Sequence, residues 1–245
     1  MTARVDRLWP DSAEHLGDDE LVTALEGVRV NFVSSVDGAA TRDGRSGGLS
    51  GPADKRRFEL LRRLSDVVLV GAGTVRDEGY GPLRVSEASS AWRRANGMPA
   101  HPVFAIASRR LDLDPGSRLF TEAPVRPVII TTELRAAGED PDLPDRLAEV
   151  ADLIMVGRER VDLVAAIGAL GERGLSRILS EGGPSLFGSL IAADVVDELC
   201  VTVEPSLEAG DARRIASSPV ALSAGLSLAE VLRSGSTLLL RYARG

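Results

Sequence analysis

The sequence predicts an α/β fold with a mixed, mostly parallel sheet, helices on both of its faces and an antiparallel C-terminal hairpin. Strand-like and helix-like segments alternate through most of the chain, which is typical of parallel strands joined by helices. Asp66–Val70 is almost continuously apolar, as expected for a strand covered on both faces. Leu226–Leu232 and Thr237–Ala243 flank a tight turn at Ser234-Gly235, so these two strands must run antiparallel.

The elements follow from local patterns. Residues 1–27 are polar and acidic and are expected to form an N-terminal arm with a short helix at Asp18–Glu26, ahead of a single domain over residues 28–245. Pro is favoured at the first position of a helix, so Pro52 is expected to begin a helix that ends near Ser65. Tyr80–Gly97 is expected to be mostly loop. Strands are predicted at Val28–Ser34, Asp66–Val70, Val103–Ala107, Pro127–Thr131, Leu153–Val156, Arg177–Ser180 and Asp197–Val203, and further helices at Leu143–Val150, Val161–Arg173 and Pro184–Ala193.

Composition excludes several classes of protein. The formal net charge of −7 argues against a nucleic-acid surface. No apolar run approaches the roughly 20 residues that cross a bilayer, and the N-terminus lacks the apolar core of a secretory signal. The single cysteine, Cys200, lies in an apolar strand pattern, and no cluster of His and Cys suggests a metal site. We therefore expect a cytoplasmic protein that binds no metal, membrane or nucleic acid.

The segment Arg177–Ala193 is the most informative one. It reads as a strand, then Glu181, two glycines, and Pro184 at the start of a helix. The first turn of a helix leaves backbone N–H groups free and carries partial positive charge, which suits an anion such as a phosphate. Gly182 and Gly183 remove the side chains that would hold a ligand away. The same pattern also fits a tight strand-to-helix turn without a ligand.

A second glycine cluster, Val67–Gly79, does not match the dinucleotide-binding fingerprint. Gly71 and Gly73 fit its first two positions, but Arg76 stands where the third glycine belongs. What remains is a buried strand that brings Gly73 and Thr74 to the carboxyl edge of the sheet, where open α/β sheets bind ligands. Thr74 could cap a short helix or donate to a phosphate.

Five segments in order resemble the riboflavin-pathway pyrimidine reductase family, which has a dihydrofolate-reductase-like fold. They are NFVSSVDGAAT at Asn31–Thr41, LLRRLSDVVLVGAGTV at Leu60–Val75, PLRV at Pro82–Val85, SEGGPSLFGSL at Ser180–Leu190 and VVDELCVTVEPS at Val195–Ser206. The resemblance implies an enzyme that uses NADPH to reduce the ribose of a phosphoribosylamino-pyrimidine to a ribityl chain. It also implies a homodimer, with the C-terminal strands as the expected contact.

The resemblance implies roles for residues at matching positions. Asp37 would be the catalytic-site carboxylate near the pyrimidine. The substrate side would be lined by Ser46, Arg62, Leu83, Arg84 and Glu181. The cofactor would contact Gly73, Thr74, Glu78, Ser108 and the turn formed by Gly182, Gly183, Pro184, Ser185 and Leu186. Chemistry agrees, because the arginine fork matches phosphate oxygens and a carboxylate accepts from the N–H groups of an aminouracil or a pterin.

This chain also departs from the family pattern. Gly48 stands where an aromatic residue is common, Glu78 replaces an aspartate, and the loop Glu78–Leu83 has one extra residue. The zinc deaminase domain that often precedes this reductase is not expected, because the sequence has no H-x-E followed by P-C-x-x-C. Two alternatives stay open: dihydrofolate reductase activity on the same fold, and a dimeric NADP-binding sensor without catalysis.

Overall fold

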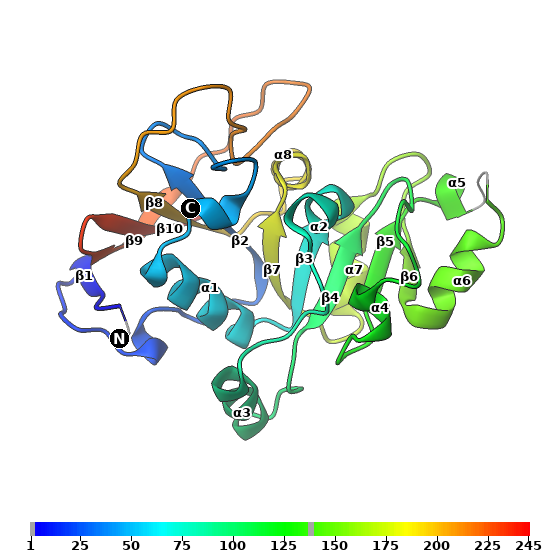
Figure 1. Ribbon diagram of the computed structural model, residues 1–245, viewed down its shortest axis with the longest axis horizontal. Coiled ribbons are helices and arrows are strands. Elements are labelled where there is room, and N and C mark those ends of the chain that lie inside the picture. Colours follow the sequence, from blue (N-terminus) through cyan, green and yellow to red (C-terminus); the bar gives the residue numbers. More distant parts are fainter. Residues whose placement is uncertain (1–2, 137–139) are drawn as a thin grey trace.

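The structure is a computed structural model that describes residues 3–136 and 140–245. Its strands are β1 Asp6–Trp9, β2 Gly27–Ser35, β3 Val67–Gly71, β4 Val103–Ala107, β5 Val128–Thr131, β6 Asp152–Met155, β7 Arg177–Gly182, β8 Glu198–Glu204, β9 Ser227–Ser234 and β10 Thr237–Ala243. In the described part of the chain they form one sheet in the order β1-β9-β10-β8-β2-β7-β3-β4-β5-β6 (Figure 1).

The predicted fold class is confirmed. Neighbouring strands from β8 through β2, β7, β3, β4 and β5 to β6 are parallel. The C-terminal hairpin β9–β10 is antiparallel, and β10 also pairs antiparallel with β8. The N-terminal segment contributes β1, which pairs antiparallel with β9 at the edge of the sheet.

Helices cover both faces of the parallel part of the sheet (Figure 1). The α-helices are α1 Pro52–Leu64, α2 Ala72–Glu78, α3 Glu87–Ala95, α4 Arg118–Thr121, α5 Glu133–Ala136, α6 Leu143–Val150, α7 Leu163–Gly171 and α8 Pro184–Ala192. Side chains of β3 alternate between two cores. Val68 and Val70 pack with apolar residues of α1, α2, α4 and α6, whereas Val67 and Leu69 pack with those of α7 and α8.

Two local predictions were wrong. The helix expected at Asp18–Glu26 is a single 3₁₀ turn, Asp18–Glu20, after which Leu21 and Val22 enter the core and Gly27 begins β2. The loop expected at Tyr80–Gly97 contains α3. This helix is built largely from polar and charged residues, and its Arg93 is fully buried, where it donates to the carbonyl oxygens of Arg63 and Ser65 at the end of α1.

The topology brings four strand ends to one edge of the sheet. Parallel strands β2, β7 and β3 end at Ser35, Gly182 and Gly71, and β8 ends beside β2 at Glu204. Helices α1, α2 and α8 begin at this edge or close to it. In the described residues, no helix is both long and apolar enough to cross a membrane.

Candidate functional site

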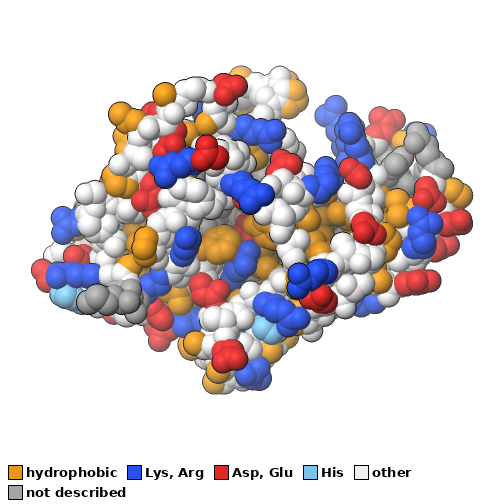
Figure 2. Space-filling model, in the orientation of Figure 1, with side chains coloured by type: hydrophobic (Ala, Val, Ile, Leu, Met, Phe, Trp, Pro, Cys, Tyr) orange, Lys and Arg blue, Asp and Glu red, His pale blue; other side chains and the backbone are white. Residues whose placement is uncertain are grey.

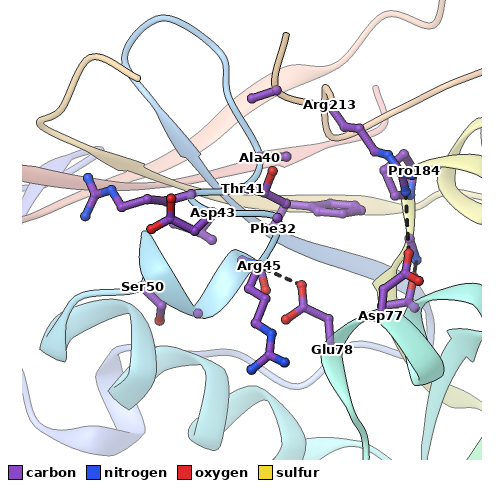
Figure 3. Close-up of a pocket in the computed structure, with 18 of the residues that line it drawn as sticks. Phe32, Ala40, Thr41, Asp43, Arg45, Ser50, Asp77, Glu78, Pro184 and Arg213 are labelled. Atoms are coloured by element: carbon purple, nitrogen blue, oxygen red, sulfur yellow. Dashed lines mark hydrogen bonds and ion pairs between the residues drawn. The ribbon is translucent and has the colours of Figure 1, made fainter. Parts of the chain in front are cut away.

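A cavity of about 1020 Å³ opens at this carboxyl edge. Its walls come from β2, the loop of residues 40–50, the first turns of α1, the helix α2, the end of β7 and residues 208–213 of the loop that joins β8 to β9. Figure 2 shows a hollow near the middle of this face, with hydrophobic side chains at its base and basic side chains beside it. Figure 3 shows several of the lining side chains.

One wall of the cavity is the junction of α2 and α8. The Thr74 hydroxyl oxygen accepts a hydrogen bond of 2.9 Å from the Gly183 N–H. Glycine at position 183 allows this close approach, because a Cβ there would lie 2.2 Å from Thr74 Oγ1. Gly182 allows a second close contact, because a Cβ there would lie 2.5 Å from Phe32 Cζ. Gly182 also has a φ of +85°, a conformation that favours glycine. Since no side chain caps α8, the N–H groups of its first turn stay available to an anion.

A second wall holds a buried ion pair. Arg62 of α1 donates two hydrogen bonds of 2.6 Å, from Nε and Nη2, to the two carboxylate oxygens of Glu181 at the end of β7. The Tyr80 hydroxyl donates to the same carboxylate at 2.9 Å. Burial would lower the pKa of Arg62, but Glu181 more than offsets this and the pKa is raised; for Tyr80, burial and then Glu181 raise the pKa. Both Arg62 and Tyr80 therefore keep their protons.

The third wall is the face of α1 that turns toward the cavity. Asp54, Phe58 and Arg62 are four residues apart, so they form one stripe along the helix. The Arg62 guanidinium lies 4.3 Å from the centre of the Phe58 ring, and Asp54 and Phe58 both line the cavity. Asp54 is 4% exposed and accepts a hydrogen bond from the Ser50 hydroxyl. Burial raises the pKa of its carboxyl group.

Several polar contacts shape the rim of the cavity. Glu78 of α2 accepts a hydrogen bond of 2.9 Å from the Ser46 N–H, which ties the two rims together. Arg213 reaches past Pro184 to Asp77, with 3.5 Å between its Nη1 and the Asp77 carboxylate (Figure 3). Two lining cations, Arg45 and Lys55, form no ion pair with any described residue, and Figure 3 shows the Arg45 side chain directed into the space beside Glu78.

Asp37 has a different position from the one expected. It is exposed and does not line the cavity. Its carboxylate accepts from the Ser35 hydroxyl and from the N–H groups of Ala209 at 2.8 Å and Glu208 at 3.0 Å. These bonds lower its pKa to about 2, with the bond from Ser35 having the largest effect. Asp37 therefore holds the wall formed by residues 208–213.

The structure brings only part of the predicted set together. Six predicted residues line the cavity: Ser46, Thr74, Glu78, Glu181, Gly183 and Pro184. Gly73, Gly182, Ser185 and Leu186 flank the Thr74–Gly183 junction in the chain, and Arg62 lies behind Glu181.

Three predicted residues lie elsewhere. Leu83 is buried in the core on the α1 face of the sheet. Arg84 donates to the Glu122 carbonyl oxygen at 2.8 Å, and Ser108 is buried, with its N–H bonded to Ile130. The structure therefore does not bring these three to the cavity.

Sequence reasoning missed Asp54, Phe58 and Tyr80 on the walls, and Arg45 and Lys55 among the lining cations. The spacing of Asp54, Phe58 and Arg62 along α1 was a usable signal, because it places them on one face. Tyr80 lies in the loop with the extra residue.

Comparison with known proteins identifies the family. The model of the RibD C-terminal domain matches residues 26–240. The chain belongs to this family. It is 29% identical to the 2,5-diamino-6-ribosylamino-4(3H)-pyrimidinone 5′-phosphate reductase of Archaeoglobus fulgidus, over 73% of this chain and 80% of the relative. It is 28% identical to the protein of the same name from Methanothermobacter thermautotrophicus, over 77% and 82%.

The solved structures agree with this assignment. The crystal structure of a pyrimidine reductase-like protein from Corynebacterium diphtheriae superimposes with a TM-score of 0.79 at 27% identity, and the match covers 89% of this chain and 91% of that one. The resemblance to the riboflavin-pathway reductases that the sequence segments indicated is therefore confirmed, and so is the fold that it implied.

Proposed function

We propose that this protein is an NADPH-dependent reductase that converts the ribosyl group of a phosphoribosylamino-pyrimidine of riboflavin biosynthesis into a ribityl chain. One observation carries the proposal: a single cavity joins the Thr74–Gly183 junction to the carboxylates of Glu181 and Asp54. In a family with reductase relatives, this arrangement supports binding of an anionic cofactor at the junction and of a heterocycle beside the two carboxylates.

The residues at the α2–α8 junction fit a dinucleotide. A Cβ on Gly183 would meet Thr74, so glycine keeps this surface open at the backbone, and the first turn of α8 offers unpaired N–H groups to phosphate oxygens. When bound there, the reduced nicotinamide supplies the hydride. The protein's own contribution is to hold the sugar close and to exclude water, for which residues 208–213 form the outer wall.

The phosphate of the substrate needs cations, and the residues expected to supply them are engaged elsewhere. Arg62 is held by Glu181, and Arg84 donates to a backbone carbonyl. Arg45 and Lys55 line the cavity without an ion partner among the described residues. We therefore assign these two side chains to the phosphate end of the substrate.

A homodimer is the proposed assembly. The face of β8 and β10 opposite α1 carries half-buried apolar side chains in register, with Val203 beside Leu238, Val201 beside Leu240 and Leu199 beside Tyr242. A second copy of the chain would cover this surface. Light scattering after size exclusion should give twice the monomer mass, and Leu240→Lys should give the monomer. The cytoplasmic location expected from the sequence is part of the same proposal.

The direct test is to mix the purified protein with NADPH and 2,5-diamino-6-ribosylamino-4(3H)-pyrimidinone 5′-phosphate and to follow the loss of reduced-nicotinamide absorbance. We expect oxidation that depends on the pyrimidine, slower oxidation with NADH, and a ribitylamino product by mass spectrometry. Oxidation with dihydrofolate alone would favour the pterin alternative. Tight NADPH binding without oxidation by any pyrimidine or pterin would favour the sensor.

A further inference from the structure

Asp54 is a buried carboxylate that faces the cavity and has few hydrogen-bond donors around it. It lies in the first turn of α1, is 4% exposed, and lines the cavity beside Ser50 and Phe58. An ionised carboxylate can accept about four hydrogen bonds. The structure supplies the Ser50 hydroxyl at one oxygen, and the Thr202 hydroxyl also lies close enough to favour the ionised form. The buried Asp54 carboxylate can therefore accept further hydrogen bonds, although it has little contact with bulk water.

The neighbouring charges do not satisfy this carboxylate. Arg57, three residues along α1, donates to the Leu240 carbonyl oxygen at 3.2 Å and to the Cys200 Sγ at 3.5 Å. Burial favours the protonated form of Asp54, and the negative charge of Glu204 at the end of β8 acts in the same direction. Burying a carboxylate with few donors costs stability, so a ligand that brings N–H donors would offset part of that cost.

The helix offers a simpler reason for an acidic residue, because Asp in the first turn interacts favourably with the helix dipole. That reason applies to any solvent-facing position in the turn and does not require burial. Asp54 instead points to the cavity wall on the same stripe as Phe58, whose ring offers an apolar face to a planar heterocycle. Asp54 is therefore placed to accept hydrogen bonds from the edge of a heterocycle whose face packs on the Phe58 ring.

We propose that Asp54 recognises the 2-amino-4-oxo edge of the substrate, with the ring N3–H and the 2-amino N–H donating in parallel to its two oxygens. This inference rests on the proposed function and names the substrate: the pyrimidine that still carries its 2-amino group. In the deaminated uracil the same edge presents one N–H between two carbonyl oxygens. One of these would face the carboxylate, with no hydrogen between them.

The edge chemistry is shared by two heterocycles, the diaminopyrimidinone and a pterin, and the experiment separates them. Reduction rates of the wild-type protein and of Asp54→Asn are measured with the 2-amino ribosylamino-pyrimidinone phosphate, its deaminated uracil counterpart and dihydrofolate. Binding without cofactor is measured by NMR with 2,6-diaminopyrimidin-4-one and 6-aminouracil, which differ only at C2. Asp145→Asn is the matched control, since it makes the same change at an exposed position on α6, outside the cavity.

We expect the wild-type protein to prefer the 2-amino compound by between about 10-fold and 100-fold, the range of a hydrogen bond to a charged group. Asp54→Asn should reduce this preference to within about threefold, whereas Asp145→Asn should keep it. Equal use of both pyrimidines by the wild type, or an undiminished preference in Asp54→Asn, would overturn the inference.

Failure of the proposed function has a different result. If neither pyrimidine is reduced but the NMR preference for the 2-amino fragment is present and depends on Asp54, the edge recognition stands and the pyrimidine reductase assignment fails. Reduction of dihydrofolate alone, lost in Asp54→Asn, would likewise keep the recognition and assign it to a pterin.

Discussion

Arg62 and Glu181 face each other across the cavity wall with both guanidinium–carboxylate hydrogen bonds at 2.6 Å, although 119 positions separate them in the chain. The carboxylate side chain is 2% exposed and the guanidinium side chain 15% exposed. Removing one partner of such a pair leaves the other charge buried, whereas replacing both with apolar residues of similar size is often neutral.

We therefore expect Arg62→Ala to lower the free energy of unfolding by about 3–5 kcal/mol, measured by urea denaturation. The double variant Arg62→Met/Glu181→Leu should recover most of this loss. A double variant as unstable as the sum of the single variants would contradict the pairing. The control is Arg118→Ala, which breaks a solvent-exposed pair with Glu122 and should change stability by less than about 1 kcal/mol.

The Thr74–Gly183 contact gives a second prediction. A Cβ on Gly183 would lie 2.2 Å from Thr74 Oγ1 and 3.6 Å from Thr74 Cβ, so only the hydroxyl stands in its way. Gly183→Ala should weaken NADPH binding at least about tenfold, because the wall of the proposed cofactor site must shift. Thr74→Ala combined with Gly183→Ala removes the obstructing atom.

The double variant should therefore bind NADPH more tightly than Gly183→Ala alone, as measured by isothermal titration calorimetry. Equal loss in the single and double variants would show that the close approach of these two residues is not what requires glycine. Gly174→Ala is a poor control because its φ is positive, whereas Gly168→Ala adds a methyl group in open space on α7 and should leave binding unchanged.

Asp37 predicts an acid-sensitive loop. Its pKa of about 2 lies below the usual 3.8, so its bonds stabilise the 208–209 segment above pH 4 and are lost as the pH falls toward 2. The protection factors of the Glu208 and Ala209 amides in hydrogen exchange should fall over this range in the wild type. In Asp37→Asn the same amides should exchange fast already at neutral pH. Protection factors that are high in both proteins and do not change with pH would mean that Asp37 does not hold this wall.

The sequence was a good guide to the sheet and a partial guide to the site, for physical reasons. Strand β3 is predictable because burial on both faces leaves an almost continuous apolar run in the chain. Helix α3 is not, because it buries Arg93 instead of an apolar stripe, although Ser86, which accepts from the Ser89 N–H, marks its start.

Some site residues could likewise be predicted from the sequence and others could not. Thr74 and Gly183 were assigned from their segments, and both line the cavity. That Arg62 is engaged by Glu181 could not be read from the chain, since the spacing of charges along α1 says nothing of a partner on β7. Asp54 was missed because it stands in a charged run, where most members face water; only the tertiary structure shows that it is buried.

The burial of Asp54 predicts a conflict between stability and function. Burial and the nearby Glu204 raise the pKa of its carboxyl group, while Arg57 opposes the shift. The folded protein therefore binds a proton more tightly than the unfolded chain, so stability falls as the pH rises from the unfolded value of 3.8 through the folded one and stays lower above it. Above this raised pKa the folded state carries a buried charge that is only partly compensated by Ser50, Thr202 and Arg57.

Asp54→Asn removes that charge and keeps an oxygen that can accept from Ser50. We expect it to stabilise the protein at pH 7 by about 1 kcal/mol, or roughly 2–4 °C in Tm, and to lose this advantage progressively as the pH is lowered toward 4, because the folded wild-type carboxyl takes up its proton at a higher pH than the unfolded one. Thermal denaturation at both pH values checks this. A variant less stable than the wild type at pH 7 would mean that the carboxylate has a compensating partner in the folded state.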